Sequence, residues 1–382
     1  MSGMLRVLAV NVGSSSLKLD VRELGVAAAL IKLEVRGIGR ARGVLVENGV
    51  EVSEQVFADH AAAFTALAAR LPEPRRLARI GHRIVHGGPR YRATTWITAA
   101  VLDELEALVP LSPLHLPPAL AVVRASRARF PEPPHAAVFD TAFHSTLPAR
   151  AYTYAIPAAW RDAGIRRYGF HGIACADVVA QLGTALRPRA VLLHLGAGCS
   201  ATALRDGVSI DTTMGLTPLE GLMMASRSGD LDPGALLYAQ RALGLSVDEV
   251  ERALNQASGL LGVSECSANM RSVLQRQDDP RAALAVELFC YRAAKTVGAL
   301  TVALGGLDQL IFSGGIGEHA GAIRARIMAQ LAFLGLRVAD PDQGGDDGVI
   351  SAPLSAVEAR IVRVDEGRAI AAEAAGLSLP SH

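Results

Sequence analysis

The chain has 382 residues, of which half are apolar and a fifth are charged, and its formal net charge at neutral pH is +1. This balance excludes disordered and fibrous classes, and it lacks the basic excess typical of proteins that bind nucleic acid or membrane surfaces. The length exceeds that of a usual single hydrophobic core, so we expect two domains.

The cysteines and the apolar runs indicate the cellular compartment of the protein. Cys175, Cys199, Cys266 and Cys290 show neither a Cys-x-x-Cys pair nor a metal-finger spacing, which favours a reducing cytoplasm. The N-terminal run Val7–Val10 is too short for a signal peptide, and Thr296–Gly306 is too short for a membrane span. We therefore expect a cytoplasmic protein.

The first predicted feature along the chain is a strand, a tight turn and a second strand. The β-branched run Leu5–Val12 stops at Gly13, and a second strand resumes over Leu17–Val21 after three serines. Backbone N–H groups and hydroxyls of such a turn can approach a phosphate, and Lys18, one of only three lysines, adds an ammonium group. The alternative interpretation is a plain β-turn.

Two further features follow in the first half. The spacing of His82 and His86 could indicate a metal pair on a helix, but Ile84, Val85 and the following glycines favour a strand end. Arg83 is better interpreted as an anion-binding cation. Asp140 directly follows an apolar strand, a position where catalytic groups of α/β folds commonly lie, although a helix cap or a turn would also place an aspartate there.

Cations beside glycines recur in the middle of the chain. Arg166–Gly172 and Met224–Asp230 each combine arginine with glycine. Each segment alone could be a surface turn. Together they supply fixed cations of the kind that phosphoryl transfer requires, because its transition state spreads negative charge over equatorial oxygens.

The strand–turn–strand pattern recurs over Val191–Leu204, with the turn at Gly196-Ala197-Gly198. The glycines partly match a dinucleotide fingerprint, but Ala201–Ile210 alternates like a hairpin instead of opening a helix, which argues against a nicotinamide enzyme. The chain contains no Gly-x-x-x-x-Gly-Lys-Ser/Thr motif. Two halves that open on the same hairpin suggest an internal duplication.

A third glycine-rich turn, Gly314–Glu318, follows the strand Leu310–Phe312 and precedes a helical pattern through Ile323 and Leu331. A helix N-terminus after a strand can hold phosphate. Further helices are predicted over Val101–Val109, Pro117–Arg129, Pro233–Leu243 and Arg281–Leu304, and a surface loop over Asp340–Gly348. Strands that alternate with helices predict an α/β fold.

These segments, in this order, resemble acetate kinase, a family within the sugar kinase, heat-shock cognate and actin superfamily. The resemblance rests on Asn11–Lys18, Gly81–Gly88, Leu111–Pro118, Val138–Pro148, Arg166–Gly172, His194–Ser200, Asp211–Gly234 and Phe312–Glu318, and Thr217–Met224 is its most specific part. It implies two ribonuclease-H-like domains facing a central cleft, in a homodimer. The first domain would comprise residues 1–144 with a returning C-terminal helix at 366–382, and the nucleotide-binding domain residues 145–365.

The resemblance implies reversible phosphoryl transfer from ATP to acetate, giving acetyl phosphate and ADP, with no nucleic-acid or membrane partner. It carries catalytic roles to Asp140, Arg83, His171, Arg227 and His115, and the binding of Mg²⁺, with Mn²⁺ as an alternative, to Asn11 and Glu366. The apolar substrate pocket would be formed by Val85, Leu114, Phe170 and Pro218. Phosphate and nucleotide would be bound by Ser14, Ser16, Lys18, His194, Leu195, Gly196, Ala197, Gly198, Asn269, Met270, Arg271, Gly315, Ile316, Gly317, Glu318 and His319.

The chain also departs from the family pattern. Asn is usual at Ala197, Leu116 and His319, Asp at Asn269, an acidic residue at Gly367, and Thr-Ser-His at Ile173-Ala174-Cys175. Loss of one charge-assisted hydrogen bond at Ala197 would cost about 1.5–3 kcal/mol, or roughly ten- to a hundredfold in affinity or rate. Two alternatives stay open: a kinase for propionate or another short-chain carboxylate, and a weakened nucleotide-binding relative that acts as a scaffold or sensor.

Overall fold

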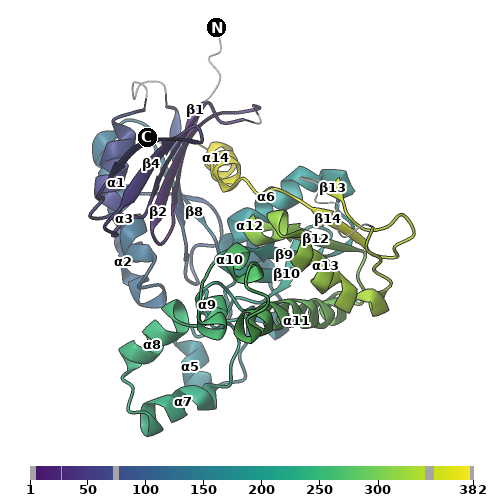
Figure 1. Cartoon of the computed structure of the whole chain (residues 1–382). Coiled ribbons are helices and arrows are strands. Elements are labelled where there is room, and N and C mark those ends of the chain that lie inside the picture. The colour runs from purple at the N-terminus through teal and green to yellow at the C-terminus, as the bar shows by residue number, and fades with distance from the viewer. Residues whose placement is uncertain (1–5, 27, 72–76, 340–347, 379–382) are drawn as a thin grey trace. The chain divides into compact units, whose positions relative to one another are not determined.

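The computed structural model describes residues 6–26, 28–71, 77–339 and 348–378. The chain forms two compact units (Figure 1). Unit 1 comprises Met1–Phe143, Gly172–Asp177 and Asp365–His382, and unit 2 comprises His144–His171 and Val178–Val364. Among the helices of the described residues, none combines the length and the apolar character needed to cross a bilayer.

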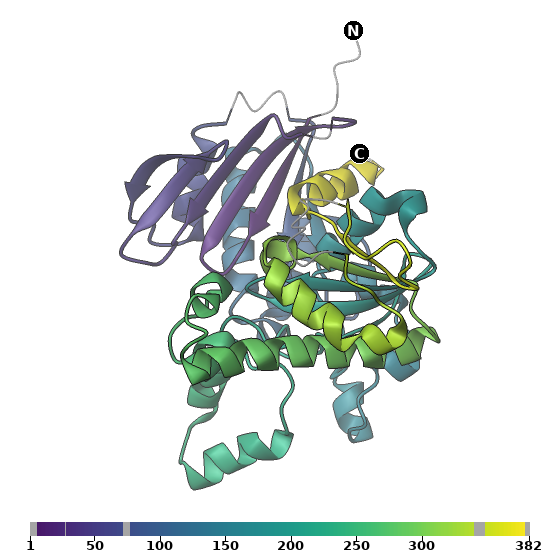
Figure 2. The ribbon, with the colours of Figure 1, turned by 45° about the vertical axis from the view of Figure 1, so that its right-hand side comes forward.

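Unit 1 is built on an eight-stranded sheet in the order β5-β4-β3-β2-β1-β6-β8-β7 (Figure 2). The strands β1, β2 and β3 pair antiparallel, whereas β1, β6 and β8 pair parallel. The parallel strands therefore end at the same edge of the sheet. The strands are β1 (Arg6–Val12), β2 (Ser16–Glu23), β3 (Ile31–Arg36), β4 (Gly43–Glu47), β5 (Val50–Gln55), β6 (Arg79–Ile84), β7 (Thr95–Trp96) and β8 (His135–Phe139).

Helices cover both faces of this sheet. Its helices are α1 (His60–Ala68), α2 (Ala99–Ala107), α3 (Leu116–Arg129) and α14 (Glu366–Gly376). The alternation in β2 sends Leu17, Leu19 and Val21 into the core that includes Phe64 of α1 and Leu120 of α3. On the other face, a smaller core joins Val7 and Ala9 of β1 to α14. Helix α14, late in the chain, therefore packs against the sheet beside β1, the first strand.

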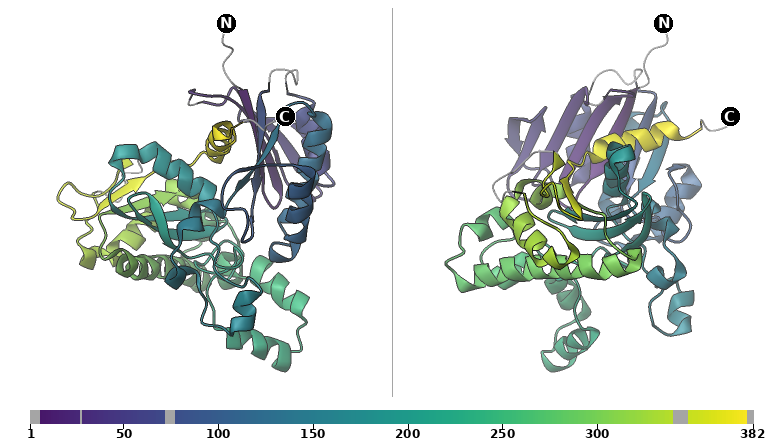
Figure 3. Two further views of the ribbon diagram at one scale, coloured as in Figure 1. Left: turned by 180° about the vertical axis from the view of Figure 1, so that it is seen from behind. Right: turned by 90° about the vertical axis from the view of Figure 1, so that its right-hand side faces the viewer.

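Unit 2 is built on a six-stranded sheet in the order β11-β10-β9-β12-β14-β13. Its strands are β9 (Arg189–Leu195), β10 (Cys199–Arg205), β11 (Val208–Thr212), β12 (Gln309–Ser313), β13 (Gly348–Val349) and β14 (Glu358–Ile361). Its helices are α4 (Ala149–Tyr152), α5 (Ala158–Asp162), α7 (Pro233–Ala242), α8 (Val247–Gln256), α9 (Gly259–Ser264), α10 (Met270–Leu274), α11 (Pro280–Leu304), α12 (Gly314–His319) and α13 (Gly321–Gln330), while α6 (Gly172–Leu182) begins in unit 1 (Figure 3).

The two sheets confirm the predicted duplication and the α/β fold. The strand order β3-β2-β1-β6-β8 in unit 1 corresponds to β11-β10-β9-β12-β14 in unit 2, with the same antiparallel and parallel pairings. Both sheets open on the hairpins that the sequence predicts. The four predicted helices are present as α2, α3, α7 and α11, each within two residues of its expected bounds.

The third glycine turn differs from its expectation in one respect. Gly314–Glu318 is itself part of a short helix, α12, which Ala320 separates from α13. Gly314 has a φ of +75°, so it turns the chain sharply at the end of β12 and helical geometry begins at once. The predicted loop Asp340–Gly348 lies outside the described residues except for Gly348.

Candidate functional site

The polar groups of unit 1 gather at the edge where its parallel strands end. Asn11 lies near the end of β1, Arg83 near the end of β6, and Asp140 directly after β8. Because the carboxyl ends of parallel strands meet at one edge of a sheet, residues far apart in sequence come together there. Glu366, the first residue of α14, joins them and accepts a hydrogen bond of 2.6 Å from Asn11 Nδ2.

Arg83 and Asp140 form a buried ion pair at the centre of this group. Arg83 donates to Asp140 Oδ2 from Nη2 at 2.7 Å and from Nε at 3.0 Å, and to Asn11 Oδ1 from Nη1 at 3.1 Å. Asp140 is 1% exposed. Burial raises the pKa of Asp140, although the charge of Arg83 acts in the opposite direction. For Arg83, the negative charges of Asp140 and Glu366 outweigh the effect of burial and raise its pKa.

The same edge has the donor chemistry of a magnesium site. Asp140 Oδ1 is buried and has no hydrogen-bond partner among the described residues, so Asp140 keeps a free acceptor oxygen in the group that also contains the amide of Asn11 and the carboxylate of Glu366. Mg²⁺ prefers oxygen ligands and is commonly held by one or two carboxylates with water and substrate phosphates. No group of three or more His, Cys, Asp or Glu residues that could hold a metal occurs among the described residues, and this mode of binding does not need one.

The histidines next to Arg83 do not lie on a helix, which agrees with the predicted strand end: His82 is in β6 and His86 follows that strand. His82 lies in β6, and its Nε2 is 2.9 Å from His135 Nδ1. The carbonyl of Phe130 accepts from His135 Nε2 at 2.9 Å, so in the neutral pair His82 donates and its own Nδ1 carries no proton. That Nδ1 is buried, and no described residue forms a hydrogen bond with it. Burial lowers the pKa of both rings.

The Gly13–Lys18 hairpin is a tight turn, closed by a hydrogen bond of 2.8 Å from Gly13 N to Ser16 O. The side chain of Lys18 is 55% exposed, and its Nζ lies 4.0 Å from Glu34 on the neighbouring strand. Ser14 is also exposed. A contact that sequence reasoning missed fixes the turn: His60 Nε2 is 2.8 Å from the carbonyl of Gly13.

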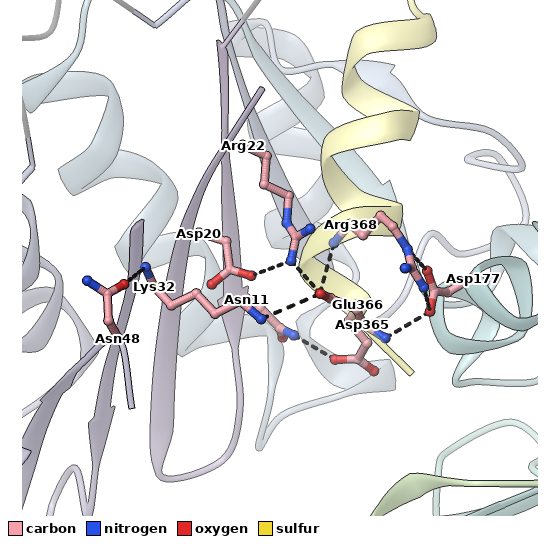
Figure 4. A network of polar contacts seen from close by, with 9 residues as sticks. All are labelled: Asn11, Asp20, Arg22, Lys32, Asn48, Asp177, Asp365, Glu366 and Arg368. Carbon is pink, nitrogen blue, oxygen red and sulfur yellow. Dashed lines mark hydrogen bonds and ion pairs between the residues drawn. The ribbon is translucent and has the colours of Figure 1, made fainter. Parts of the chain in front are cut away.

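A second polar network, also missed by sequence reasoning, links β2 to the start of α14 (Figure 4). Arg22 Nη2 donates to Asp20 at 3.1 Å and to Asp365 at 2.5 Å. Asp365 caps α14 by accepting from Arg368 N, and Arg368 pairs in turn with Asp177 at 2.8 and 2.9 Å. The polar face of β2, which carries Lys18, Asp20 and Arg22, was the available signal.

In unit 2, three of the predicted residues come together. His171 Nδ1 lies 3.0 Å from Ser200 Oγ. A Cβ placed on Gly198 would be 3.1 Å from His171 Nε2 and 3.6 Å from Arg227 Nη1, so the glycine lies between the imidazole and the guanidinium. Arg227 Nη1 also donates to the carbonyl of Pro218 at 3.2 Å. His171 adopts a left-handed conformation with a φ of +60°, which is uncommon without glycine and occurs often at functional sites.

The glycine turns after β9 and β12 approach each other. A Cβ on Gly196 would be 3.9 Å from Gly315 N, and His194 Nδ1 is 3.1 Å from Ser313 Oγ. Glu318 accepts from Gly314 N at 2.9 Å and from Val364 N at 3.2 Å, so its carboxylate holds the turn in place. Gly315 and Ala197 are both exposed, and a Cβ placed on Gly315 would have no atom within 4 Å among the described residues.

The remaining predicted residues differ in their contacts and in how far they are exposed. Asn269 caps α10 by accepting from Arg271 N at 2.9 Å, and His319 is exposed. Leu195, Met270, Val85 and Phe170 are buried, whereas Leu114 is 44% exposed and His115 precedes α3. Gly317 is buried, and Ile316 and Ser16 are half-buried.

Several departures from the family pattern have a packing explanation. Leu116, Ile173 and Cys175 are all buried, and Ile173 belongs to the core around α14. A polar side chain at these positions would need a buried hydrogen-bond partner. The apolar residues therefore fit their surroundings in this chain.

Arg166 and Arg167 contribute to the fold. Arg167 donates to the carbonyls of Thr212 and Thr213 and to Glu220, at 2.6–2.9 Å, and Arg166 lies 3.6 Å from the ring centroid of Tyr152.

Comparisons with known proteins agree along the whole chain. The model of the acetokinase family matches residues 6–372. An acetate kinase of Micrococcus luteus is 43% identical over 385 aligned residues, which cover 96% of this chain and 97% of its own. The crystal structure of an acetate kinase from Porphyromonas gingivalis matches with a TM-score of 0.88 and 34% identity, over 97% of this chain and 99% of its own. A propionate kinase from Francisella tularensis matches with a TM-score of 0.91 and 36% identity, over 98% and 100%.

Proposed function

The chain belongs to the acetokinase family and is a phosphotransferase that uses ATP and the carboxyl group of acetate, and we propose that Arg83, Asp140, His171 and Arg227 carry its chemistry. The observation that carries this assignment is the buried Arg83–Asp140 pair, joined to Asn11 and Glu366 at one sheet edge. Acetyl phosphate and ADP are the products in one direction, and acetate and ATP in the other.

Positioning and charge are the contributions of these residues. Asp140 orients Arg83, whose guanidinium binds the acetate carboxylate or the phosphoryl group. Arg227 and His171, held beside Gly198, stabilise the equatorial oxygens of the phosphoryl group in flight. Gly172, the residue covalently after His171, donates its N–H to the carbonyl of Asp140 at 2.8 Å. We propose that both sets of residues act on the same phosphoryl group when ATP and acetate are bound, with domain closure as part of the cycle.

Asn11 and Glu366 are proposed to hold Mg²⁺, with Asp140 nearby, and Mn²⁺ is expected to substitute. When bound, the ion neutralises phosphate charge. Ser14, Ser16 and Lys18 are proposed to meet phosphate, and the turns at His194–Gly198 and Gly315–His319, together with Asn269–Arg271, to surround the nucleotide. The substrate methyl group is assigned to Val85, Leu114, Phe170 and Pro218, and His115 to the same neighbourhood.

Propionate is the second candidate acceptor, because a propionate kinase is among the matching structures. One added methylene is worth only about 1–3 kcal/mol in an apolar pocket, so the two acids compete closely. A scaffold or sensor function would instead require that no acid is phosphorylated.

The test is to trap acyl phosphate with hydroxylamine while the purified chain is supplied with ATP and Mg²⁺. Acetate, propionate and butyrate are compared at equal concentrations, with Arg227→Ala as the control for site-dependent turnover. We expect acetyl hydroxamate to form fastest. Faster trapping with propionate would make propionate the preferred acceptor. If no acid gave a product, the result would favour the scaffold or sensor function.

Two properties of the whole protein are also proposed. Within the described part of the chain the four cysteines form no disulfide, and this supports the proposal of a reducing compartment such as the cytoplasm. A homodimer follows from the resemblance and is tested by light scattering of the purified chain.

A further inference from the structure

The polar face of β2 is tied to the start of the helix that carries Glu366. Arg22 has a side chain only 3% exposed, and it bonds to Asp20 on its own strand and to Asp365, the cap of α14. Lys32 Nζ adds a contact of 3.5 Å to Asp365. Asp365, the residue before Glu366, is therefore held by Arg22 of β2, and Glu366 itself is held by Asn11 of β1.

Gly367, the residue after Glu366, lies against Asp20. A Cβ added to Gly367 would be 2.2 Å from Asp20 Oδ2, 2.9 Å from its Cγ and 3.3 Å from its Cβ. The two shorter distances are below those of real contacts, so a side chain at position 367 would require the carboxylate of Asp20 to move. Gly367 is not among the glycines with positive φ, so this close approach, and not the backbone conformation, favours glycine here.

Glycine is less favourable than alanine in a helix, because it loses more backbone freedom on folding. The Asp20 carboxylate beside the first turn of α14 provides an offset, because negative charge is stabilising at a helix N-terminus. The family pattern carries an acidic residue at this position, whereas this chain has the carboxylate in the same space but on a different strand.

We propose that Asp20 supplies, from β2, the second carboxylate that the family pattern places at position 367, and that it acts as a positioning residue for the magnesium site of Asn11 and Glu366. This inference rests on the function proposed above. Asp20 would act through its negative charge, as an outer carboxylate that orients the residues that would hold the ion. Arg22 donates both to Asp20, which lies against Gly367, and to Asp365, the residue before Glu366 (Figure 4).

The test measures metal binding directly. Mn²⁺ replaces Mg²⁺, and its affinity for the full chain in the presence of ADP is titrated by electron paramagnetic resonance. The variants are Asp20→Asn, which keeps the shape of the side chain, and the double change Asp20→Ala with Gly367→Glu, which moves the carboxylate to the family position. The matched control is Glu54→Gln, an exposed carboxylate of the same unit that pairs with Arg42.

We expect Asp20→Asn to weaken Mn²⁺ affinity by about ten- to a hundredfold, as for other outer-shell partners, with Glu54→Gln unchanged. The double variant is expected to regain most of the lost affinity, because the removal of the Asp20 carboxylate opens the space for a side chain at position 367. A purely structural role would lower the melting temperature of Asp20→Asn without changing its Mn²⁺ affinity. That result, or an equal loss in the double variant, would overturn the inference.

The proposed metal site has a separate test in the same titration. Glu366→Gln should weaken Mn²⁺ binding by itself. If the unmodified chain with ADP bound no Mn²⁺, or if Glu366→Gln bound it normally, the metal site would be wrong and this inference with it. If Glu366→Gln lost binding while Asp20→Asn kept it, only the inference about Asp20 would be wrong.

Discussion

Arg83 donates to Asp140 from both Nε and Nη2, and both hydrogen bonds end on the same oxygen, Oδ2. The other oxygen, Oδ1, is buried and has no hydrogen-bond partner among the described residues. Buried acceptors in native structures are nearly always satisfied, by the protein itself or by a water or an ion. This pair therefore combines a fixed cation with an acceptor that a water or an ion can satisfy.

The first prediction concerns the stability of this pair. Arg83→Met should lower the free energy of unfolding by about 3–5 kcal/mol, because it leaves the carboxyl of Asp140 buried without its cation. The double change Arg83→Met with Asp140→Asn should cost less than the single change. Urea unfolding at neutral pH measures both, and additive losses would contradict the buried-pair interpretation. Both variants should fail to form acyl hydroxamate.

The second prediction concerns Arg227. Arg227→Ala should lower kcat by on the order of a thousandfold, by analogy with arginines that stabilise the transition state of phosphoryl transfer. The control is Arg252→Ala, which removes an exposed arginine from α8 of the same unit. Turnover is measured by hydroxylamine trapping with acetate. Near-normal turnover in Arg227→Ala would remove Arg227 from the catalytic set.

The third prediction is a pH dependence of stability. Burial lowers the pKa of His82 well below its ordinary value of 6.5, and His135 and Arg127 lower it further. Burial also lowers the pKa of His135, and this effect exceeds the opposite effect of its hydrogen bond to the carbonyl of Phe130. The unfolded chain therefore binds more protons than the folded chain below pH 6.5, so stability is full above that pH and falls as the pH drops below it.

Each such histidine contributes a slope of about 1.4 kcal/mol per pH unit. Urea unfolding of the unmodified chain and of His82→Gln, compared at neutral and mildly acidic pH, tests this contribution. The variant should lose less stability on acidification, because one proton fewer is taken up on unfolding. An identical loss in the two proteins would show that the buried pair does not control the dependence.

The fourth prediction concerns the departure at Ala197. This residue is exposed in the turn between β9 and β10, and its carbonyl accepts from Ala225 N at 3.1 Å. An Asn side chain therefore has room there and could bond to phosphate. Ala197→Asn should raise kcat/KM for ATP by roughly ten- to a hundredfold. Ala197→Leu, of similar size but without the amide, should give no gain; a gain in both variants would point to a change in packing.

The local sequence patterns predicted the elements that position the site. The alternation over Leu17–Val21 and the position of Asp140 after an apolar strand are properties of neighbouring residues, and periodicity detects such properties. The strand interpretation of His82–His86, and the rejection of a metal pair there, rest on the same local information. The four helices and the duplicated hairpins were predicted for the same reason.

Other relationships depend on contacts between segments that are distant in the chain. Asp20 and Gly367 are 347 positions apart, and no periodicity indicates that one fills the space left by the other. Three hydrogen bonds are of the same kind. They join His60 to Gly13, His82 to His135, and Arg22 to Asp365.

By itself, the sequence determined the element types, the doubled hairpin and, through the ordered motifs, the family. Only the tertiary structure decided which oxygen of Asp140 has no hydrogen-bond partner among the described residues, and which carboxylate lies against Gly367. The physical reason is that backbone preference and apolar spacing act over a few residues, whereas the burial and pairing of polar groups are set where the folded chain brings distant segments within hydrogen-bond reach.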